Sequence, residues 1–76
     1  MKIKLRLFST LRDQAGFDEK EIETSAPRLV REFFSDYFDD KYLSFVRAAI
    51  NCEYVSHDTP VCDGDEVAFI PPVSGG

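Results

Sequence analysis

One stretch of the sequence, residues 25–38, has apolar side chains at helical spacing and sets the architecture that a chain of 76 residues can adopt. The apolar positions fall at Leu29, Val30, Phe33, Phe34, Tyr37 and Phe38. Mostly polar residues lie between them, so this spacing predicts one amphipathic helix with a buried stripe. Pro27 suits the first turn of that helix, and Ser25 or its neighbour is placed to cap it. One such helix can cover one face of a single sheet.

Alternating segments on both sides of this helix predict strands. Residues 2–8 alternate apolar and basic side chains, and residues 19–24 alternate more weakly around Ile22. We expect the second segment to pair antiparallel with the first, near an edge. Residues 66–70 are almost all apolar, which is typical of a strand in the middle of a sheet. The first and last strands are therefore expected to lie side by side, parallel, in the sheet centre.

The remaining elements are predicted to be short. A helix capped by Ser9 or Thr10 should end at Gly16. Two short strands, residues 48–51 and 54–55, should be joined by a tight turn at Cys52-Glu53. Three further segments show no strand or long-helix pattern. Residues 42–46 fit either a helical turn or an extended connection, and residues 56–62 are expected to be irregular. Residues 63–65 should form a turn around Gly64.

Together these elements predict an α+β fold. Its mixed sheet has four to five strands and is covered on one face by one main helix. Residues 1–72 would form this single domain, and residues 73–76 would form a flexible Gly-Gly tail. Pro71-Pro72 separates the two, because two consecutive prolines favour an extended backbone and end a strand ladder.

Charge, hydrophobicity and cysteine spacing limit the kinds of partner that the chain is expected to bind. The net charge of −5 argues against nucleic-acid binding. We expect no membrane association and a cytoplasmic protein, because the sequence shows no leader-like segment and no apolar run near the roughly 20 residues that span a bilayer. Cys52 and Cys62 lie ten positions apart, which fits no common zinc pattern. Both are interpreted as reduced thiols, and no metal is expected.

The last fourteen residues, from Asp63 to Gly76, resemble the carboxyl-terminal signature of the small, sulfur-carrying subunit of molybdopterin synthase. That family belongs to the ubiquitin-like β-grasp sulfur carriers. Residues 48–51 resemble its third-strand segment more loosely. Residues 8–16 follow it more loosely, with Arg12 and an acidic residue ahead of a glycine.

The resemblance implies a carrier that is not an enzyme by itself. An adenylating enzyme of the ubiquitin-activating type would use ATP to activate the Gly76 carboxylate, which then becomes a thiocarboxylate. The tail would deliver this sulfur to a cyclic pterin in the large synthase subunit, and Gly75 would let the backbone pass close to partner groups. The chain itself is expected to bind no cofactor.

The resemblance also suggests where partners would bind, and His57 is interpreted as a loop residue with no role. Phe69 and Ile70 point to opposite faces of the last strand, so one should be core; the resemblance favours Ile70 as the residue that faces the partner. The candidate contact residues are Phe69, Ile70, Pro71, Pro72, Val73, Ser74 and Arg12.

Three other functions share some of these features. A sulfur carrier for the thiazole of thiamine would have the same fold and Gly-Gly end, although Pro71-Pro72 is unusual there. A ubiquitin-like modifier would instead be conjugated to lysine through Gly76. A plain interaction domain would make no use of its last residues. Isolating the chain from cells separates them, because the carrier gains sulfur and the modifier forms conjugates.

Overall fold

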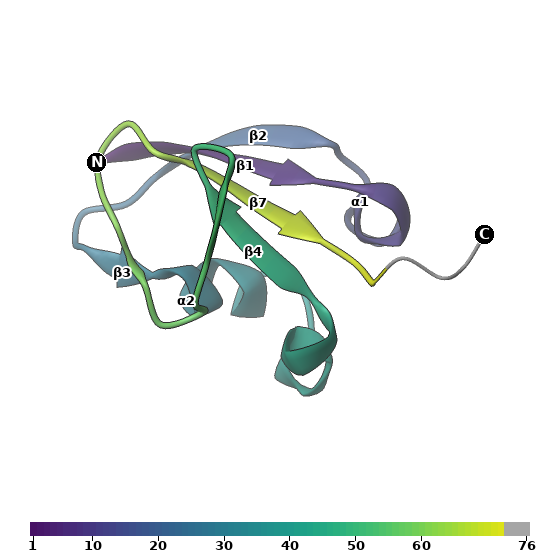
Figure 1. Cartoon of the computed structure of the whole chain (residues 1–76). Coiled ribbons are helices and arrows are strands. Elements are labelled where there is room, and N and C mark those ends of the chain that lie inside the picture. Colours follow the sequence, from purple (N-terminus) through teal and green to yellow (C-terminus); the bar gives the residue numbers. More distant parts are fainter. Residues whose placement is uncertain (73–76) are drawn as a thin grey trace.

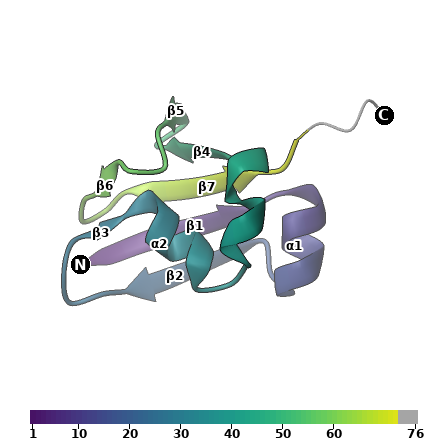
Figure 2. The same ribbon diagram turned by 90° about the horizontal axis from the view of Figure 1, so that it is seen from below.

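The computed structural model describes residues 1–72, and in it a five-stranded sheet has its helices on one face and at one end (Figures 1 and 2). The strands run in the order β2-β1-β7-β4-β5 across the sheet. Their bounds are β1 (Lys2–Leu7), β2 (Glu19–Glu23), β4 (Arg47–Ile50), β5 (Glu53–Val55) and β7 (Glu66–Ile70). The remaining elements are α1 (Ser9–Ala15), β3 (Arg28–Leu29), α2 (Val30–Ser35), the 3₁₀ helix η1 (Asp40–Phe45) and β6 (Pro60–Val61).

The first and last strands lie together in the centre, as the sequence predicts. β1 and β7 are parallel, with Leu5 opposite Val67, and each has an antiparallel neighbour on its other side. Leu5 and Val67 are both completely buried. The mixed α+β sheet predicted from the sequence is confirmed.

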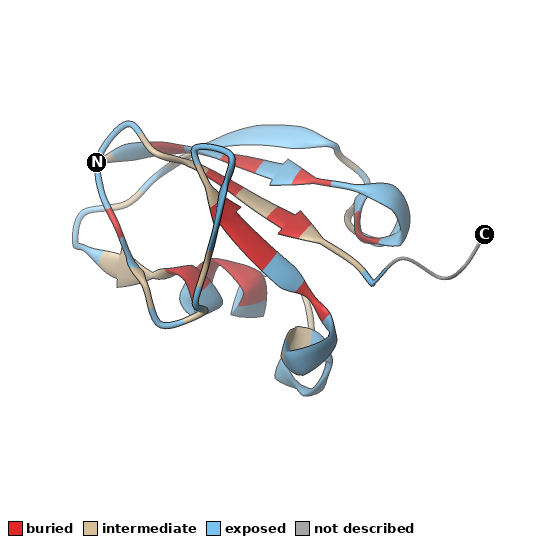
Figure 3. Cartoon of the chain, in the orientation of Figure 1, coloured by how far each residue is buried: buried red, intermediate tan, exposed pale blue. Residues whose placement is uncertain are grey.

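The core lies between the sheet and the helices on its covered face (Figure 3). Phe34 of α2 packs edge-to-face on Phe69 of β7, with 5.3 Å between the ring centroids. This contact joins the predicted helical stripe to the central strand. The buried residues of the core cluster are Ile3, Leu5, Leu7, Leu11, Val30, Phe33, Phe34, Val46, Ala48, Val61, Val67 and Phe69.

The main helix begins later than the sequence predicts. α2 starts at Val30 rather than near Pro27, because Arg28 and Leu29 pair as β3 with β6. Glu32 caps the helix in place of Ser25: the Leu29 amide donates to the Glu32 Oε1 at 3.2 Å. β6 lies within the segment predicted to be irregular, so that prediction is wrong at Pro60–Val61.

Arg28 ties β3 to α2. Its guanidinium donates to Asp36 at 2.8 Å and to Glu32 at 3.4 Å, and lies 4.7 Å from the ring centroid of Phe33. The hydrogen bond to Asp36 raises the pKa of Arg28 above its ordinary value. Because the folded pKa is raised, this contribution to stability is complete below the unfolded pKa and is lost only as pH rises through the folded one. It therefore persists across the neutral range.

The structure tests the predictions for three shorter elements: the first helix, the tight turn and residues 42–46. No side chain caps α1, whose N-cap position is Phe8 rather than Ser9 or Thr10, whereas Gly16 ends the helix as predicted with φ of 87°. The tight turn lies one residue early, at Asn51-Cys52, where φ is 52° and 72°. Asn tolerates left-handed backbone better than most residues, which favours this register. Residues 42–46 were expected to form either a helical turn or an extended connection. Most of them lie in η1, whose first turn is capped by the Asp39 side chain.

None of the helices within residues 1–72 has the length and apolar character needed to cross a bilayer. Cys52 and Cys62 are both exposed free thiols. In the same part of the chain, no three His, Cys, Asp or Glu side chains gather as a potential metal site.

Candidate functional site

The candidate site lies where β7 ends and the chain continues through Pro71-Pro72, beside the end of β1 (Figures 1 and 2). Phe69 and Ile70 point to opposite faces here, as predicted. Phe69 is 0% exposed, so it belongs to the core and presents no surface to a partner; this removes it from the predicted contact residues. Ile70 is half-buried on the sheet face away from the helices.

Pairing across the strands assembles an apolar surface around Ile70. Ala68 lies beside Ala49 of β4, and Ala49 lies beside Tyr54 of β5. Phe8 follows β1 and shares its outward face with Arg6, whose guanidinium lies 5.2 Å from the Phe8 ring centroid. We call this surface the outer patch and define it as Phe8, Ala49, Tyr54, Ala68 and Ile70.

The outer patch differs from the other half of the same sheet face. There, Lys2 and Lys4 lie 4.0 and 3.8 Å from carboxylate oxygens of Glu21 and Glu19 on β2. Such exposed pairs add little to stability, but they satisfy each other's charge. In contrast, Phe8 and Tyr54 are 37% and 65% exposed. Ala68 and Ile70 are half-buried and Ala49 is buried, so Phe8 and Tyr54 supply most of the exposed apolar surface, which suits this half of the sheet to contact with another protein.

Two hollows flank the prolines at the end of β7. On the outer side, a hollow of about 360 Å³ is lined by Arg47, Tyr54 and Ile70 together with both prolines. On the helix side, a hollow of about 370 Å³ is lined by the same prolines and by aromatic residues. Those aromatic residues are Phe34, Phe38, Tyr42 and Phe45. Pro71 and Pro72 thus lie between two partly apolar hollows, so another protein could contact this segment from either side.

Arg12 lies on α1, exposed, with its Nε 3.7 Å from an oxygen of the neighbouring Asp13. It lines a further hollow with Phe8 and Arg6. The structure therefore places Arg12 beside the Phe8 end of the outer patch, where a partner covering the patch could reach it. Its predicted contact role stays a prediction.

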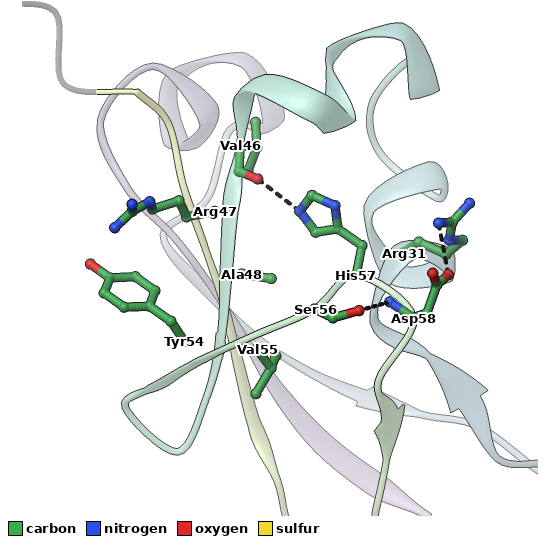
Figure 4. A pocket seen from close by; sticks show the side chains of 9 residues that line it. All are labelled: Arg31, Val46, Arg47, Ala48, Tyr54, Val55, Ser56, His57 and Asp58. Atoms are coloured by element: carbon green, nitrogen blue, oxygen red, sulfur yellow. Dashed lines mark hydrogen bonds and ion pairs between the residues drawn. The ribbon is translucent and has the colours of Figure 1, made fainter.

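His57 lies in a hollow of about 560 Å³ that is lined by residues of α2, of β4 and of the loop after β5, and that also reaches Arg47 and Tyr54 (Figure 4). Its Nε2 forms a 2.8 Å hydrogen bond with the Val46 carbonyl oxygen, and Arg31 forms an ion pair with Asp58 at 2.7 Å. These contacts tie the loop after β5 to the start of β4 and to α2. The sequence interpretation gave His57 no role, and the structure gives it a structural one.

Five residues of the outer patch and the outer hollow were not predicted as contacts from the sequence: Phe8, Arg47, Ala49, Tyr54 and Ala68. Phe8 could have been found from the sequence. It follows Lys4 and Arg6 on the outward-facing side of the alternation, where an aromatic ring stands in place of a charged side chain. Arg47 and Tyr54 come from short strands whose register only the sheet reveals. Val73, Ser74, Gly75 and Gly76 lie outside the described residues, and their predicted roles stay predictions.

The sequence pattern of the ThiS family matches residues 5–76. The molybdopterin synthase sulfur carrier subunit of Escherichia coli is 38% identical over 80 residues, covering 97% of this chain and 99% of that protein. The subunit of the same name from Chlamydomonas reinhardtii is 32% identical, with all of both chains covered. Both matches extend over essentially the full length of the chain.

Solved structures share the fold. A putative molybdopterin converting factor subunit 1 from Pyrococcus furiosus superposes with a TM-score of 0.76 at 32% identity, over 96% of this chain and 99% of that one. SAMP1 from Haloferax volcanii gives 0.79 at 24% identity, with all of both chains covered. A chain in the complex of subunits 1 and 2 of molybdopterin-converting factor from Helicobacter pylori gives 0.66 at 22%, also with full coverage. The ubiquitin-like β-grasp fold is confirmed.

Proposed function

Since the chain belongs to the ThiS family, we propose that it is the sulfur-carrying subunit of a molybdopterin synthase. The observation that carries this proposal is the 38% identity to the Escherichia coli sulfur carrier subunit over 97% of the chain. The Pro71-Pro72 step directly after β7 supports it, because two consecutive prolines end the strand ladder and favour an extended backbone where the proposed tail begins.

The proposed chemistry takes place at the Gly76 carboxylate. A free carboxylate is a resonance-stabilised anion that resists nucleophiles, so an adenylating enzyme first joins it to AMP and releases pyrophosphate from ATP. A sulfide equivalent from a sulfur donor then displaces AMP and leaves a thiocarboxylate. Its ionised sulfur is the nucleophile that the large subunit would present to a cyclic pterin. Acid–base groups and the pterin site would belong to that subunit.

The fold contributes a docking surface and a fixed starting point for delivery. β7 pairs with β1 and β4 along both of its edges, and Phe69 anchors it in the core. The outer patch and the two hollows beside Pro71 and Pro72 would rest on the large subunit, with Arg12 at the rim. Holding the sulfur near its target in this way supplies the advantage of proximity.

The test is intact-mass measurement on the chain after co-expression with the adenylating enzyme and sulfur donor of the same genome. We expect a mass gain that corresponds to one oxygen replaced by sulfur at Gly76. Deleting Gly76, replacing Gly75 with Val, or adding a residue after Gly76 should abolish sulfur delivery without changing the fold. Ser74→Thr is the matched control, because it changes the same segment and leaves the glycines intact.

Sulfur delivery that survives the Gly76 deletion would overturn the proposal. Covalent conjugates to lysine in place of a thiocarboxylate would identify the chain as a protein modifier. Full function of the chain after removal of Gly75 and Gly76 would identify an interaction domain. Thiazole formation would identify a carrier for thiamine synthesis.

A further inference from the structure

Arg47 differs from every other arginine in residues 1–72. Each of the others has a carboxylate oxygen within 4.0 Å: Arg6, Arg12, Arg28 and Arg31 are the paired ones. Arg47 has no such partner within the described residues, although the chain has 14 acidic residues and only 9 basic ones. Its guanidinium instead lies 4.9 Å from the ring centroid of Tyr54.

The position of Arg47 connects it to the proposed delivery site. It lies directly opposite Ile70 in the β4–β7 pairing, and it lines the outer hollow with Pro71 and Pro72. Figure 4 shows Arg47 and Tyr54 side by side, on the side of β4 away from His57. Both side chains are exposed. A protein that covers the outer patch would therefore cover this guanidinium as well.

Covering an unpaired guanidinium is costly. A charge that loses its water without gaining a partner is penalised by several kcal/mol, which would oppose docking. The contact with the Tyr54 ring leaves the N–H groups of the planar guanidinium available to donate. That edge matches the two oxygens of a carboxylate, which it can bind through parallel hydrogen bonds.

We propose that Arg47, held against the Tyr54 ring, binds a carboxylate side chain of the protein that receives the sulfur, and so selects partners with an acidic residue facing Ile70 and the prolines. This inference rests on the proposed function, because it assumes that the large synthase subunit covers the outer patch. A carboxylate side chain fits better than a free phosphate, because the guanidinium borders Ile70 and the two prolines, apolar neighbours that suit contact with a protein rather than with a solvated ion.

The test compares two variants that remove the same charge. Arg47→Gln and Arg31→Gln each take one positive charge from the chain, but Arg31 pairs with Asp58 on the opposite side of β4 from Arg47 and Tyr54. Titration calorimetry would measure binding of each full-length variant to the large synthase subunit of the same genome. We expect Arg47→Gln to weaken binding about 30-fold or more, the range typical of truncating a buried charge pair. Arg31→Gln should stay within about twofold, as exposed pairs do.

Two further measurements identify the partner group. Arg47→Lys keeps the charge but loses the planar fork, so we expect an intermediate loss. Replacing the acidic residues of the large subunit one at a time with their amides should reveal one whose loss is not additive with Arg47→Gln. Urea unfolding of each variant checks that the fold is retained.

The outcomes separate the two proposals. Wild-type binding with no effect of Arg47→Gln overturns the role of Arg47 and leaves the proposed function standing. A loss with Arg47→Gln that is additive with every acidic residue of the partner also overturns it. No binding by the wild-type chain, together with no thiocarboxylate at Gly76, overturns both.

Discussion

At the scale of single residues, Phe69 and Ile70 show how adjacent positions on one strand meet different surroundings. Phe69 contacts Phe34 beneath the sheet and is completely buried, whereas Ile70 is half-buried beside Arg47 on the other face. Because side chains alternate along a strand, stability and docking can be changed separately in the same short segment.

This separation predicts opposite phenotypes. Phe69→Ala should lower the free energy of unfolding by about 3–5 kcal/mol, because it leaves a cavity under the sheet. Ile70→Ala should cost roughly 1 kcal/mol, because only part of its side chain leaves water on folding. Urea denaturation measures both values. Ile70→Ala should nevertheless weaken binding to the large subunit; equal stability losses, or unchanged binding, would contradict the assignment of the two faces.

At the scale of elements, the β4–β5 hairpin shows a local pattern that the sheet decides. Asn51 and Cys52 both have a left-handed backbone. The Asn51 side chain also forms hydrogen bonds with Asp65, directly before β7, and with Glu66, the first residue of β7. Its Oδ1 accepts the Glu66 amide at 3.0 Å, and its Nδ2 donates to Asp65 at 3.0 Å. These contacts to the start of β7 hold the turn at Asn51-Cys52 and leave Glu53 in the strand.

The turn predicts a stabilising substitution. Cys52→Gly should raise the free energy of unfolding by about 0.5–1 kcal/mol, because glycine avoids the left-handed penalty that a side chain incurs. Cys52→Ala is the control, since it removes the thiol but keeps the Cβ, and should give no gain. Glu53→Gly should cost about 0.5–1 kcal/mol, because it weakens a strand. Thermal unfolding compares the three; a gain from Glu53→Gly would support the register expected from the sequence instead.

At the scale of the whole molecule, the first and last strands complete each other's hydrogen bonding in the sheet centre. β1 and β7 are separated by almost the full chain, yet Leu5 and Val67 meet at its core. The core cluster extends from Ile3 to Phe69. Folding of this chain therefore depends on pairing β1 with β7, and the candidate site at the end of β7 forms only once these two strands have paired.

This predicts a sharp difference between two truncations. A chain that ends at Pro72 should unfold within about 0.5 kcal/mol of the full chain, because it retains every residue of the core cluster. A chain that ends at Asp65 should not fold, because it loses the central strand. Circular dichroism melts distinguish them. A large loss of stability on removing residues 73–76 would show that these residues support the fold.

Local patterns were sufficient for most elements but not for the site. Residues 2–8 and 66–70 show their strands through alternation and apolar runs, and Phe33 and Phe34 show the helix stripe. β3 and β6 are two residues each, too short for any period to be visible. Their pairing delays α2 to Val30, which the sequence could not show.

By itself, the sequence determined the α+β fold, the parallel central pair and the glycine-ended segment that leads to the proposed carrier chemistry. These follow from side-chain periodicity and from the restricted backbone of two prolines, both of which act over a few residues. The tertiary structure decided that Phe8, Arg47, Tyr54 and Ile70 share one face, and that within residues 1–72 Arg47 lies over the Tyr54 ring instead of pairing with an acid. Neighbours across a sheet depend on strand order and register, which arise from packing the whole core together.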